Sequence, residues 1–184
     1  MKRTRNPDET RQKILNATRQ ILRDGGFFTQ FSLEKVARAA GVSKGGLLHH
    51  FPDKESLLCG VAQDVITQFE TTVENEQATD DDSGDTGRFT RAYIRAGLTS
   101  ETHNTTDISP VLLSFLRTTQ GNAGDSSRFS YWQEKTENDG LDVVIATIVR
   151  LAVDGLLYTE VIDGKPIDET LRRQVIERLL RLSI

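Results

Sequence analysis

The stretch from Phe31 to Phe51, "FSLEKVARAAGVSKGGLLHHF", has the pattern of two short helices that meet at a tight turn. Ser32 can cap a first helix over about 32–39. Its apolar face carries Leu33, Val36, Ala37 and Ala40. Gly41 suits the unusual backbone angle of a turn, and Val42 can fill the angle between the two helices. Ser43 can then cap a second helix over about 43–50. This spacing predicts a helix-turn-helix motif.

The N-terminal end of the second helix is suited to close contact with DNA. In such motifs the second helix lies in the major groove, and its first residues reach the base edges. Lys44 is placed for a phosphate contact, and the Ser43 hydroxyl stays exposed at the same end. Gly45 and Gly46 each cost about 1 kcal/mol of helix stability relative to alanine. They would let the backbone approach DNA closely, which favours such an approach over a purely structural helix.

Other motifs in the chain do not predict catalysis or a metal site. His49 and His50 are neighbours, and neighbours on a helix point about 100° apart, so they cannot easily share one ion. The acidic run from Asp80 resembles a calcium loop, but it would place Arg91 at the last ligand position. Walker-type and HExxH patterns are absent from the sequence. We expect no metal, no cofactor and no enzymatic activity.

The composition predicts a cytoplasmic protein with a basic head and an acidic body. Hydrophobic residues make up 36% of the 184 residues, and no apolar run is long enough for a membrane helix or a secretory signal. The single cysteine, Cys59, excludes an internal disulfide and a cysteine-rich zinc site. Residues 1–56 hold 11 Lys and Arg against 6 Asp and Glu, whereas residues 57–184 hold 12 against 21. Such a head could meet a polyanion through phosphate contacts.

Apolar residues recur at helical spacing along the whole chain, which predicts an all-α fold. In the first helix, Asp8 can cap the start, and Gly25 and Gly26 can end it. Asp53 can cap a long helix, and "TDDDSGDTG" after it is expected to be a solvated loop. Further helices are expected at about 87–100, 108–120, 126–138, 140–160 and 168–182. The fourth of these is apolar nearly all round, so both its faces should be buried. The last one should direct inward Leu171, Val175, Ile176, Leu179, Leu180 and Leu182.

Residues 10–58 resemble the DNA-binding domain of the TetR family of bacterial transcriptional regulators. The resemblance is carried by "FSLEKVARAAGVSKGGLLHHFPDKESLL", and by the Gly-Phe end of the helix before it. The rest of the chain matches that family in helical pattern and length. The resemblance implies an N-terminal three-helix helix-turn-helix domain over 1–56. It also implies a C-terminal helical effector-binding and dimerisation domain over 57–184.

The resemblance also assigns roles to residues of the DNA-binding domain. Ser32 and Lys54 would hold phosphates, and Ser43, Lys44, Gly45 and Gly46 would face the groove. His49 stands where the family often has a phosphate-contacting tyrosine, and His50 where His or Tyr is common. Leu48 departs from the pattern, because a tyrosine is common there; it would contact a thymine methyl or simply pack. Leu47 and Phe51 are expected in the core. The basic N-terminal arm would either enter a minor groove or be disordered.

In the body, the resemblance implies a small-molecule cavity lined by aromatic and polar residues. The residues assigned to it are Phe69, Phe89, Tyr93, His103, Phe115 and Trp132. The alternatives are that the aromatics are plain core and that His103 is a solvated loop residue. The stretch "YWQEK" adds a stacking surface, and Glu134 and Glu137 add negative charge. Together these would suit a flat organic ligand, either neutral or cationic.

The last two helices are more apolar than the surface of a monomer, which predicts a two-fold dimer. Its interface is assigned to Val144, Ile148, Leu151, Leu156, Leu171, Val175 and Leu179. The expected function is a homodimeric repressor that binds a palindromic operator and is released by a small organic effector. One alternative is a DNA-binding regulator without an effector. Another is a helical scaffold or enzyme with a vestigial DNA-binding head.

Overall fold

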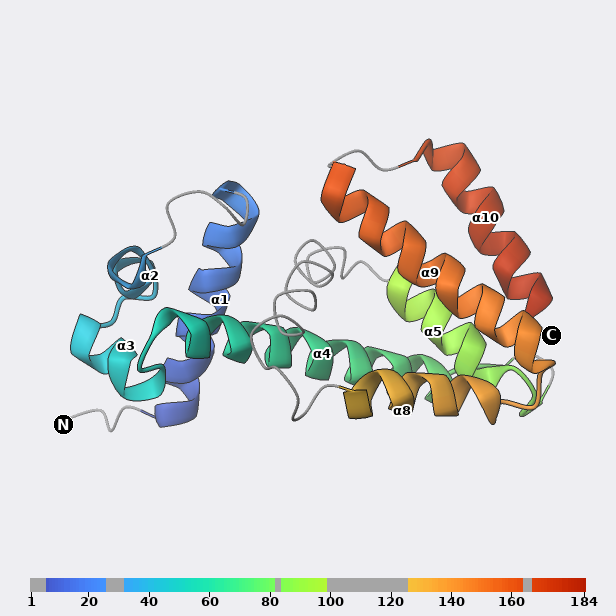
Figure 1. The fold of residues 1–184 in the computed structure, drawn as a ribbon, viewed down its shortest axis with the longest axis horizontal. Coiled ribbons are helices and arrows are strands. Elements are labelled where there is room, and N and C mark those ends of the chain that lie inside the picture. Colours follow the sequence, from blue (N-terminus) through green and yellow to red (C-terminus); the bar gives the residue numbers. More distant parts are fainter. Residues whose placement is uncertain (1–5, 26–31, 82–83, 99–125, 164–166) are drawn as a thin grey trace. The chain divides into compact units, whose positions relative to one another are not determined.

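The computed structural model describes residues 6–25, 32–81, 84–98, 126–163 and 167–184, whose regular structure is helical throughout (Figure 1). This confirms the predicted all-α class. The helices are α1 (Pro7–Gly25), α2 (Leu33–Ala39), α3 (Lys44–His50), α4 (Lys54–Ala78), α5 (Arg88–Leu98), α8 (Ser126–Glu137), α9 (Val143–Asp163) and α10 (Glu169–Leu182). The helix expected at about 108–120 lies outside the described residues. The chain divides into two compact units, Met1–Ile66 and Thr67–Ile184.

In the first unit, α1, α2 and α3 pack on one another and on the first part of α4. One face of α1 is buried, at Ile14, Leu15, Thr18, Ile21 and Leu22, which recur at helical spacing. The predicted cap of α1 is wrong, because the helix begins at Pro7 and Asn6 Oδ1 accepts a hydrogen bond from the Asp8 backbone N–H at 3.1 Å. Asp8 therefore lies inside the first turn, where its negative charge still favours the helix N-terminus.

The division between the units falls inside α4, ten residues after the boundary expected at residue 56. The reason is that the first turns of α4 pack against α1 and the end of α3. Asp64 pairs with Arg19 at 2.9 Å and accepts a hydrogen bond from Gln12 at 3.3 Å. Gly60 faces the Phe51 ring so closely that a Cβ there would lie 2.5 Å from a ring carbon.

In the second unit, α5 is the central helix and packs against α9, α10 and α8. Nine of its eleven residues are buried. Its ends are satisfied by charged residues from distant parts of the chain. Asp139 accepts hydrogen bonds from the Phe89 and Thr90 backbone N–H groups at 2.8 and 2.7 Å. Arg172 of α10 donates to the Leu98 carbonyl at 2.7 Å. Each charge opposes the partial charge at that end of the helix.

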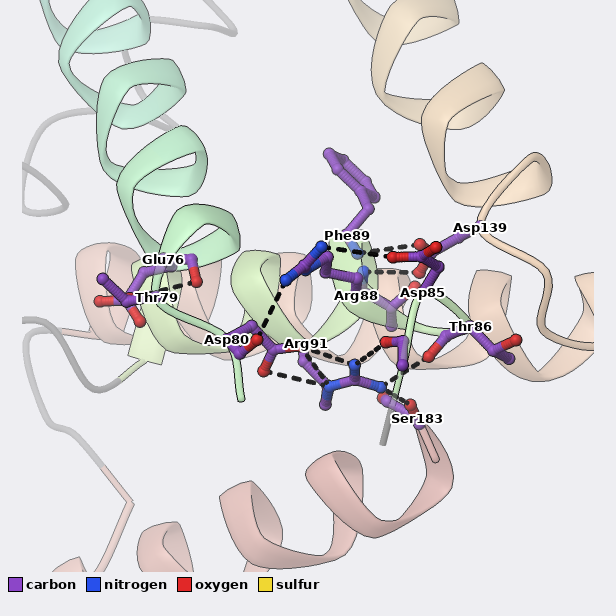
Figure 2. A network of polar contacts seen from close by, with 12 residues as sticks. Glu76, Thr79, Asp80, Asp85, Thr86, Arg88, Phe89, Arg91, Asp139 and Ser183 are labelled. Atoms are coloured by element: carbon purple, nitrogen blue, oxygen red, sulfur yellow. Dashed lines mark hydrogen bonds and ion pairs between the residues drawn. The ribbon is translucent and has the colours of Figure 1, made fainter. Parts of the chain in front are cut away.

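A buried arginine ties the end of α4, the start of α5 and the C-terminus together (Figure 2). Arg91 donates to Asp80 at 2.6 Å, to the Thr86 carbonyl at 2.7 Å and to the Ser183 carbonyl at 2.7 Å. Arg95 also pairs with Asp80. The expectation of a solvated loop over this acidic run is therefore wrong for Asp80, which is 6% exposed. Two arginines of the next helix neutralise its carboxylate and let it be buried.

The expectation that both faces of the apolar helix near 140–160 are buried is met for one face within the single chain. Within the chain, α9 has one buried face, at Ala146, Val149, Val153 and Leu157. Val144, Ile148 and Leu151 on its other face are 60%, 52% and 55% exposed. Two of the six residues expected to point inward from α10 are also exposed, Leu171 at 50% and Leu182 at 39%.

Candidate nucleic-acid interface and ligand pocket

The α2–turn–α3 segment has the geometry of a helix-turn-helix. Both predicted caps are confirmed: Ser32 Oγ accepts from the Lys35 N–H at 3.2 Å, and Ser43 Oγ accepts from the Gly46 N–H at 3.0 Å. Gly41 has φ +66°, a left-handed angle that glycine adopts without strain. Leu47 and Phe51 are buried, as expected. The caps and the turn thus fix α3 and leave its first turn at the surface.

Lys44, the first residue of α3, is paired with Glu34 of α2. The Lys44 Nζ lies 2.5 Å from Glu34 Oε1, and both side chains are more than half exposed. The hydrogen bond and charge of Lys44 lower the pKa of Glu34. The residue expected to contact a phosphate therefore has a carboxylate partner in the DNA-free chain, and sequence reasoning missed that partner.

The two glycines of α3 differ in what the fold requires of them. A Cβ at Gly46 would lie 3.2 Å from Ser43 Oγ and would crowd the hydroxyl that caps the helix. A Cβ at Gly45 would meet no atom within 4 Å. Gly45 lies in a helix, where alanine is more stable than glycine. The fold therefore gives a reason for glycine at position 46 and none at position 45.

The remaining residues assigned to DNA lie at or near the surface. His49 and Lys54 are exposed, whereas Leu48 and His50 are half-buried. The His49 and His50 rings stand edge to face, with their centroids 5.6 Å apart. In the described part of the chain, no group of His, Cys, Asp and Glu side chains has a geometry that could hold a metal ion. Lys54 opens α4 directly after Asp53, whose carboxylate accepts from the Ser56 N–H at 2.7 Å.

In the second unit, four of the six residues assigned to a ligand cavity form one aromatic cluster. Trp132 of α8 lies 5.5 Å from Phe69 of α4, and 6.0 and 5.6 Å from Phe89 and Tyr93 of α5, between ring centroids. Phe89 and Tyr93 are less than 10% exposed and belong to the core. His103 and Phe115 lie outside the described residues. The aromatic cluster thus serves first as packing between α4, α5 and α8.

A cavity of about 400 Å³ opens beside this cluster. Its lining comes from α4, α5 and α8: Glu70, Val73, Glu74, Gln77, Phe89, Tyr131 and Trp132. Phe89 and Trp132 are the sequence-assigned residues that line it. Glu134 and Glu137, expected to supply the negative charge, are exposed and do not line it. Glu70 and Glu74, one turn apart on α4, take that place. No local sequence signal separates these two glutamates from the other acidic residues of the chain.

A partly buried polar network joins α5, α8 and α9 near the cluster. The Tyr93 hydroxyl donates to Asp154 at 2.6 Å, and Arg150 donates to Asp154 and to Gln133, each at 2.9 Å. Burial raises the pKa of Asp154 despite the Tyr93 hydrogen bond and the Arg150 charge. Burial, together with the adjacent Asp154 carboxylate, also raises the pKa of Tyr93 well above its ordinary value. These contacts hold Tyr93 in place as part of the core.

Comparison with known proteins agrees with this geometry in both units. Residues 14–60 match the model of the bacterial regulatory proteins of the tetR family. Residues 87–184, more than half of the chain, match the model of the tetracyclin repressor-like C-terminal domain. The chain belongs to the TetR family.

The curated relatives of higher identity match a short part of this chain. The regulator UidR of Escherichia coli K12 is 41% identical over 49 residues, which cover 27% of this chain and 24% of UidR. The chain thus matches about a quarter of that relative's length.

Solved structures agree over most of the chain. A transcriptional regulator from Rhodococcus sp. Rha1 has a TM-score of 0.73 at 15% identity, covering 94% of this chain and 95% of its own. The multidrug binding protein EbrR complexed with ethidium has a TM-score of 0.64 at 19% identity, covering 92% and 97%. These likenesses show the fold.

The exposed apolar face of this TetR chain is continuous along α9. Val144, Ile148 and Leu151 follow one another at spacings of four and three, which places them on one side of the helix. Of the other residues assigned to a dimer interface, Leu171 is exposed, and Leu156 and Val175 are partly buried against the core. Leu179 is 6% exposed inside the core and is not available to a partner. None of the described helices is both long enough and apolar enough to cross a membrane.

Proposed function

We propose that this chain is a transcriptional repressor of the bacterial cytoplasm that binds a two-fold-symmetric DNA operator as a homodimer. A small organic effector bound in the second unit releases it from DNA. The observation that carries the proposal is the capped α2–turn–α3 segment with Ser43, Lys44 and Gly45 exposed on the first turn of α3. In helix-turn-helix proteins this turn enters the major groove.

The family supports the repressor and effector roles. Its C-terminal model is described as tetracyclin repressor-like, and EbrR, of the same fold, was solved with ethidium bound. In the proposed dimer each subunit contributes one DNA-binding unit. Release requires that the effector bind better to an arrangement of these two that does not fit DNA than to the one that does. The helix α4 contributes residues to both units and is the natural route for that coupling.

The test is selection of random duplex DNA by the purified protein at fixed salt, followed by affinity measurements on the selected sequence. A two-fold-symmetric sequence is expected. Lys44→Ala and Lys54→Ala should each weaken binding and flatten the dependence of log Kd on log salt by about one unit per phosphate contact. If folded, dimeric protein enriches no sequence, sequence-specific DNA binding is contradicted. The exception is a protein that already carries a bound ligand, which extraction after denaturation would reveal. If the salt dependence of a lysine variant equals that of the wild type, that lysine does not contact a phosphate.

A further inference from the structure

The last turn of α3 carries two neighbouring histidines at the surface. His49 is exposed and His50 is half-buried, and their rings stand edge to face with centroids 5.6 Å apart. Leu47 and Leu48, which precede them, have no polar group in their side chains. The two imidazoles are therefore the polar side chains that this end of α3 offers to another molecule.

Both imidazoles lack an ionic partner within the chain. In the described ranges, the two rings contact each other and neither forms a hydrogen bond or an ion pair. The carboxylates engaged elsewhere on α1, α2 and α4 are Glu9 with Lys13, Glu34 with Lys44, Asp64 with Arg19, and Asp53 with the Ser56 N–H. Each imidazole is thus open to a partner from outside the chain.

The other charged groups around α3 do not pair with these rings either. Arg11 of α1 lies over the Phe51 ring, 5.3 Å from its centroid. Further charged side chains of α1, α2 and the start of α4 are exposed: Asp8, Lys35, Arg38, Lys54 and Glu55. Cations outnumber carboxylates in this set, so a positive charge on an imidazole gains most when an external anion is present.

The length of α3 brings this pair close to phosphates if the first turn of α3 enters the major groove. Seven residues make a helix about 10 Å long, and the groove is about 12 Å wide. A helix of that length cannot place its last turn far from the sugar–phosphate backbone that borders the groove. His49 and His50 also lie in the sequence between Lys44 and Lys54, the two lysines proposed to contact phosphates.

Imidazoles are the side chains whose charge changes in the physiological pH range, near pH 6.5. A negative charge within about 4–6 Å favours the protonated form. A phosphate therefore draws a proton from the solvent onto an imidazole, whose two ring nitrogens are then both donors. Two positive charges on adjacent rings repel each other, so the first proton is bound more readily than the second.

We infer that DNA binding by this chain takes up about one proton from the solvent, which is held by the His49–His50 pair against a phosphate. Protonation adds a charge-assisted contact, so the affinity for DNA rises as the pH falls and decreases as the pH rises. The inference rests on the proposed DNA binding and adds a regulation to that same site. Operator occupancy then depends on pH within the physiological range.

The test is fluorescence anisotropy of the full-length protein with a labelled duplex at fixed ionic strength, over about pH 5.5–8.5. The Kd of the wild type is expected to rise about tenfold from about pH 6 to about pH 8. The slope of log Kd against log salt should be steeper at the lower pH, by up to about one unit, because one more phosphate contact is made. Isothermal titration in two buffers of different ionisation enthalpy should give a proton number near one.

The double variant His49→Gln with His50→Gln keeps hydrogen-bonding groups but cannot gain the charge. Its Kd should lie within about threefold of the wild type at about pH 8, and it should lose the roughly tenfold gain at about pH 6. His49→Arg carries a fixed charge at the same position, so its affinity should stay high at the higher pH. A merely structural role of His49 would not be restored by arginine.

Asn75→His is the matched control, because it adds an imidazole at an exposed position of the second unit. It should leave the pH dependence of the wild type unchanged. If circular dichroism shows that the double variant is unfolded, His49→Gln alone, at an exposed position, replaces it and should reduce the pH dependence. A Kd that differs less than about twofold between the two pH values, a proton number near zero, or a pH dependence that persists in the glutamine variants would overturn the inference.

Failure of this inference can be told apart from failure of the proposed function. Phosphate contacts need no particular base sequence, so a random duplex at low salt serves as the probe if the selection yields no operator. If an operator is selected and its affinity does not depend on pH, operator binding stands and the proton uptake alone is contradicted. If the folded protein binds no duplex at any salt concentration, both are contradicted.

Discussion

Lys44 has to exchange its Glu34 partner for a phosphate if it contacts DNA. We predict that Glu34→Gln tightens operator binding by about two- to fivefold, because an exposed ion pair is weak and its carboxylate repels phosphates. The salt dependence of log Kd should also steepen, by up to about one unit. Fluorescence anisotropy over a salt series measures both quantities.

The double-mutant cycle shows whether Glu34 acts through Lys44. In a Lys44→Ala background, Glu34→Gln should have less effect than in the wild type, because the pair is already broken. Equal effects in both backgrounds would mean that Glu34 repels DNA directly and that its contact with Lys44 is irrelevant to binding.

Gly45 offers a second prediction, in which stability and DNA binding change in opposite directions. Gly45→Ala should stabilise the folded chain by about 0.5–1 kcal/mol, since its Cβ meets nothing and alanine favours the helix. The same methyl group should weaken operator binding, because it occupies space between the backbone and the DNA. Urea denaturation and anisotropy on one protein preparation measure the two effects.

Gly60→Ala is the matched control for this stability argument. It makes the same change in a helix of the same unit, but its Cβ would lie 2.5 Å from the Phe51 ring. The crowding should outweigh the gain in helix propensity and destabilise the protein.

The Gly45 prediction fails if Gly45→Ala leaves operator affinity unchanged. That result would exclude a close approach of the backbone to DNA at position 45.

At the scale of elements, α5 depends on the buried Asp80–Arg91 pair beside its first turn. Burial alone would raise the pKa of Asp80, but hydrogen bonds and charges from Arg91 and Arg95 outweigh it, so the pKa lies below its ordinary value. A lowered carboxyl pKa contributes stability above the unfolded-state pKa of about 3.9, and this contribution is lost as the pH falls through the folded-state pKa.

We predict that Asp80→Asn destabilises the protein by about 3–5 kcal/mol near neutral pH, because Arg91 is left buried without its partner. The difference from wild type should begin to shrink as the pH falls below the unfolded-state pKa of about 3.9. It should vanish only below the lowered folded-state pKa, where the folded wild-type carboxyl is protonated as well. Urea denaturation across a pH series measures this. A constant difference at every pH would mean that the charge of Asp80 does not contribute and that its shape and packing do.

These elements also show what the sequence could predict. Ser32 and Ser43 cap helices through hydrogen bonds to residues three positions away, and Gly41 forms the turn through its own backbone angle. Their local pattern alone therefore predicted the helix-turn-helix. Asp80 was placed wrongly because its partners are 11 and 15 residues away, and Arg91 reaches Ser183 across 92 residues. Contacts at that range depend on how helices pack, and no local pattern records them.

The same limit applies to the candidate ligand site. The sequence assigned aromatic residues to a ligand cavity and took its acidic residues from α8, whereas the glutamates that line the cavity belong to α4. Helical spacing places Glu134 and Glu137 on one side of α8, and it does not say which side of α8 meets α4. Glu70 and Glu74 become distinguishable from other acidic residues only when the helices are packed together.

At the scale of the whole molecule, the exposed face of α9 requires an explanation. The faces of α9 were not separable in the sequence, because apolar residues continue nearly all round the helix. Once the buried face is known, Val144, Ile148 and Leu151 remain as large apolar residues exposed to water. Leu171 and Leu182 of the neighbouring helix α10 are exposed as well. Exposed apolar surface of this kind commonly marks an interface between proteins.

We predict that the proposed dimer forms through this face, so that Ile148→Glu gives a folded monomer. Ile148 is 52% exposed in the single chain, so a charge there should change the stability of a monomer little. In a two-fold interface the two glutamates would be buried near each other without partners, which is strongly unfavourable. Sedimentation equilibrium measures the mass, and circular dichroism shows whether the fold is kept.

Asn75→Asp, at an exposed position of α4, adds the same charge away from this face and should remain dimeric. The Ile148→Glu monomer should also lose most of its operator affinity, because each subunit then binds one half-site alone. A wild-type protein that is monomeric at micromolar concentration, or an Ile148→Glu variant that stays dimeric, would place the dimer contact elsewhere. In the first case a palindromic operator would have to be bound by two chains that meet only on DNA, and operator binding would become cooperative in protein concentration.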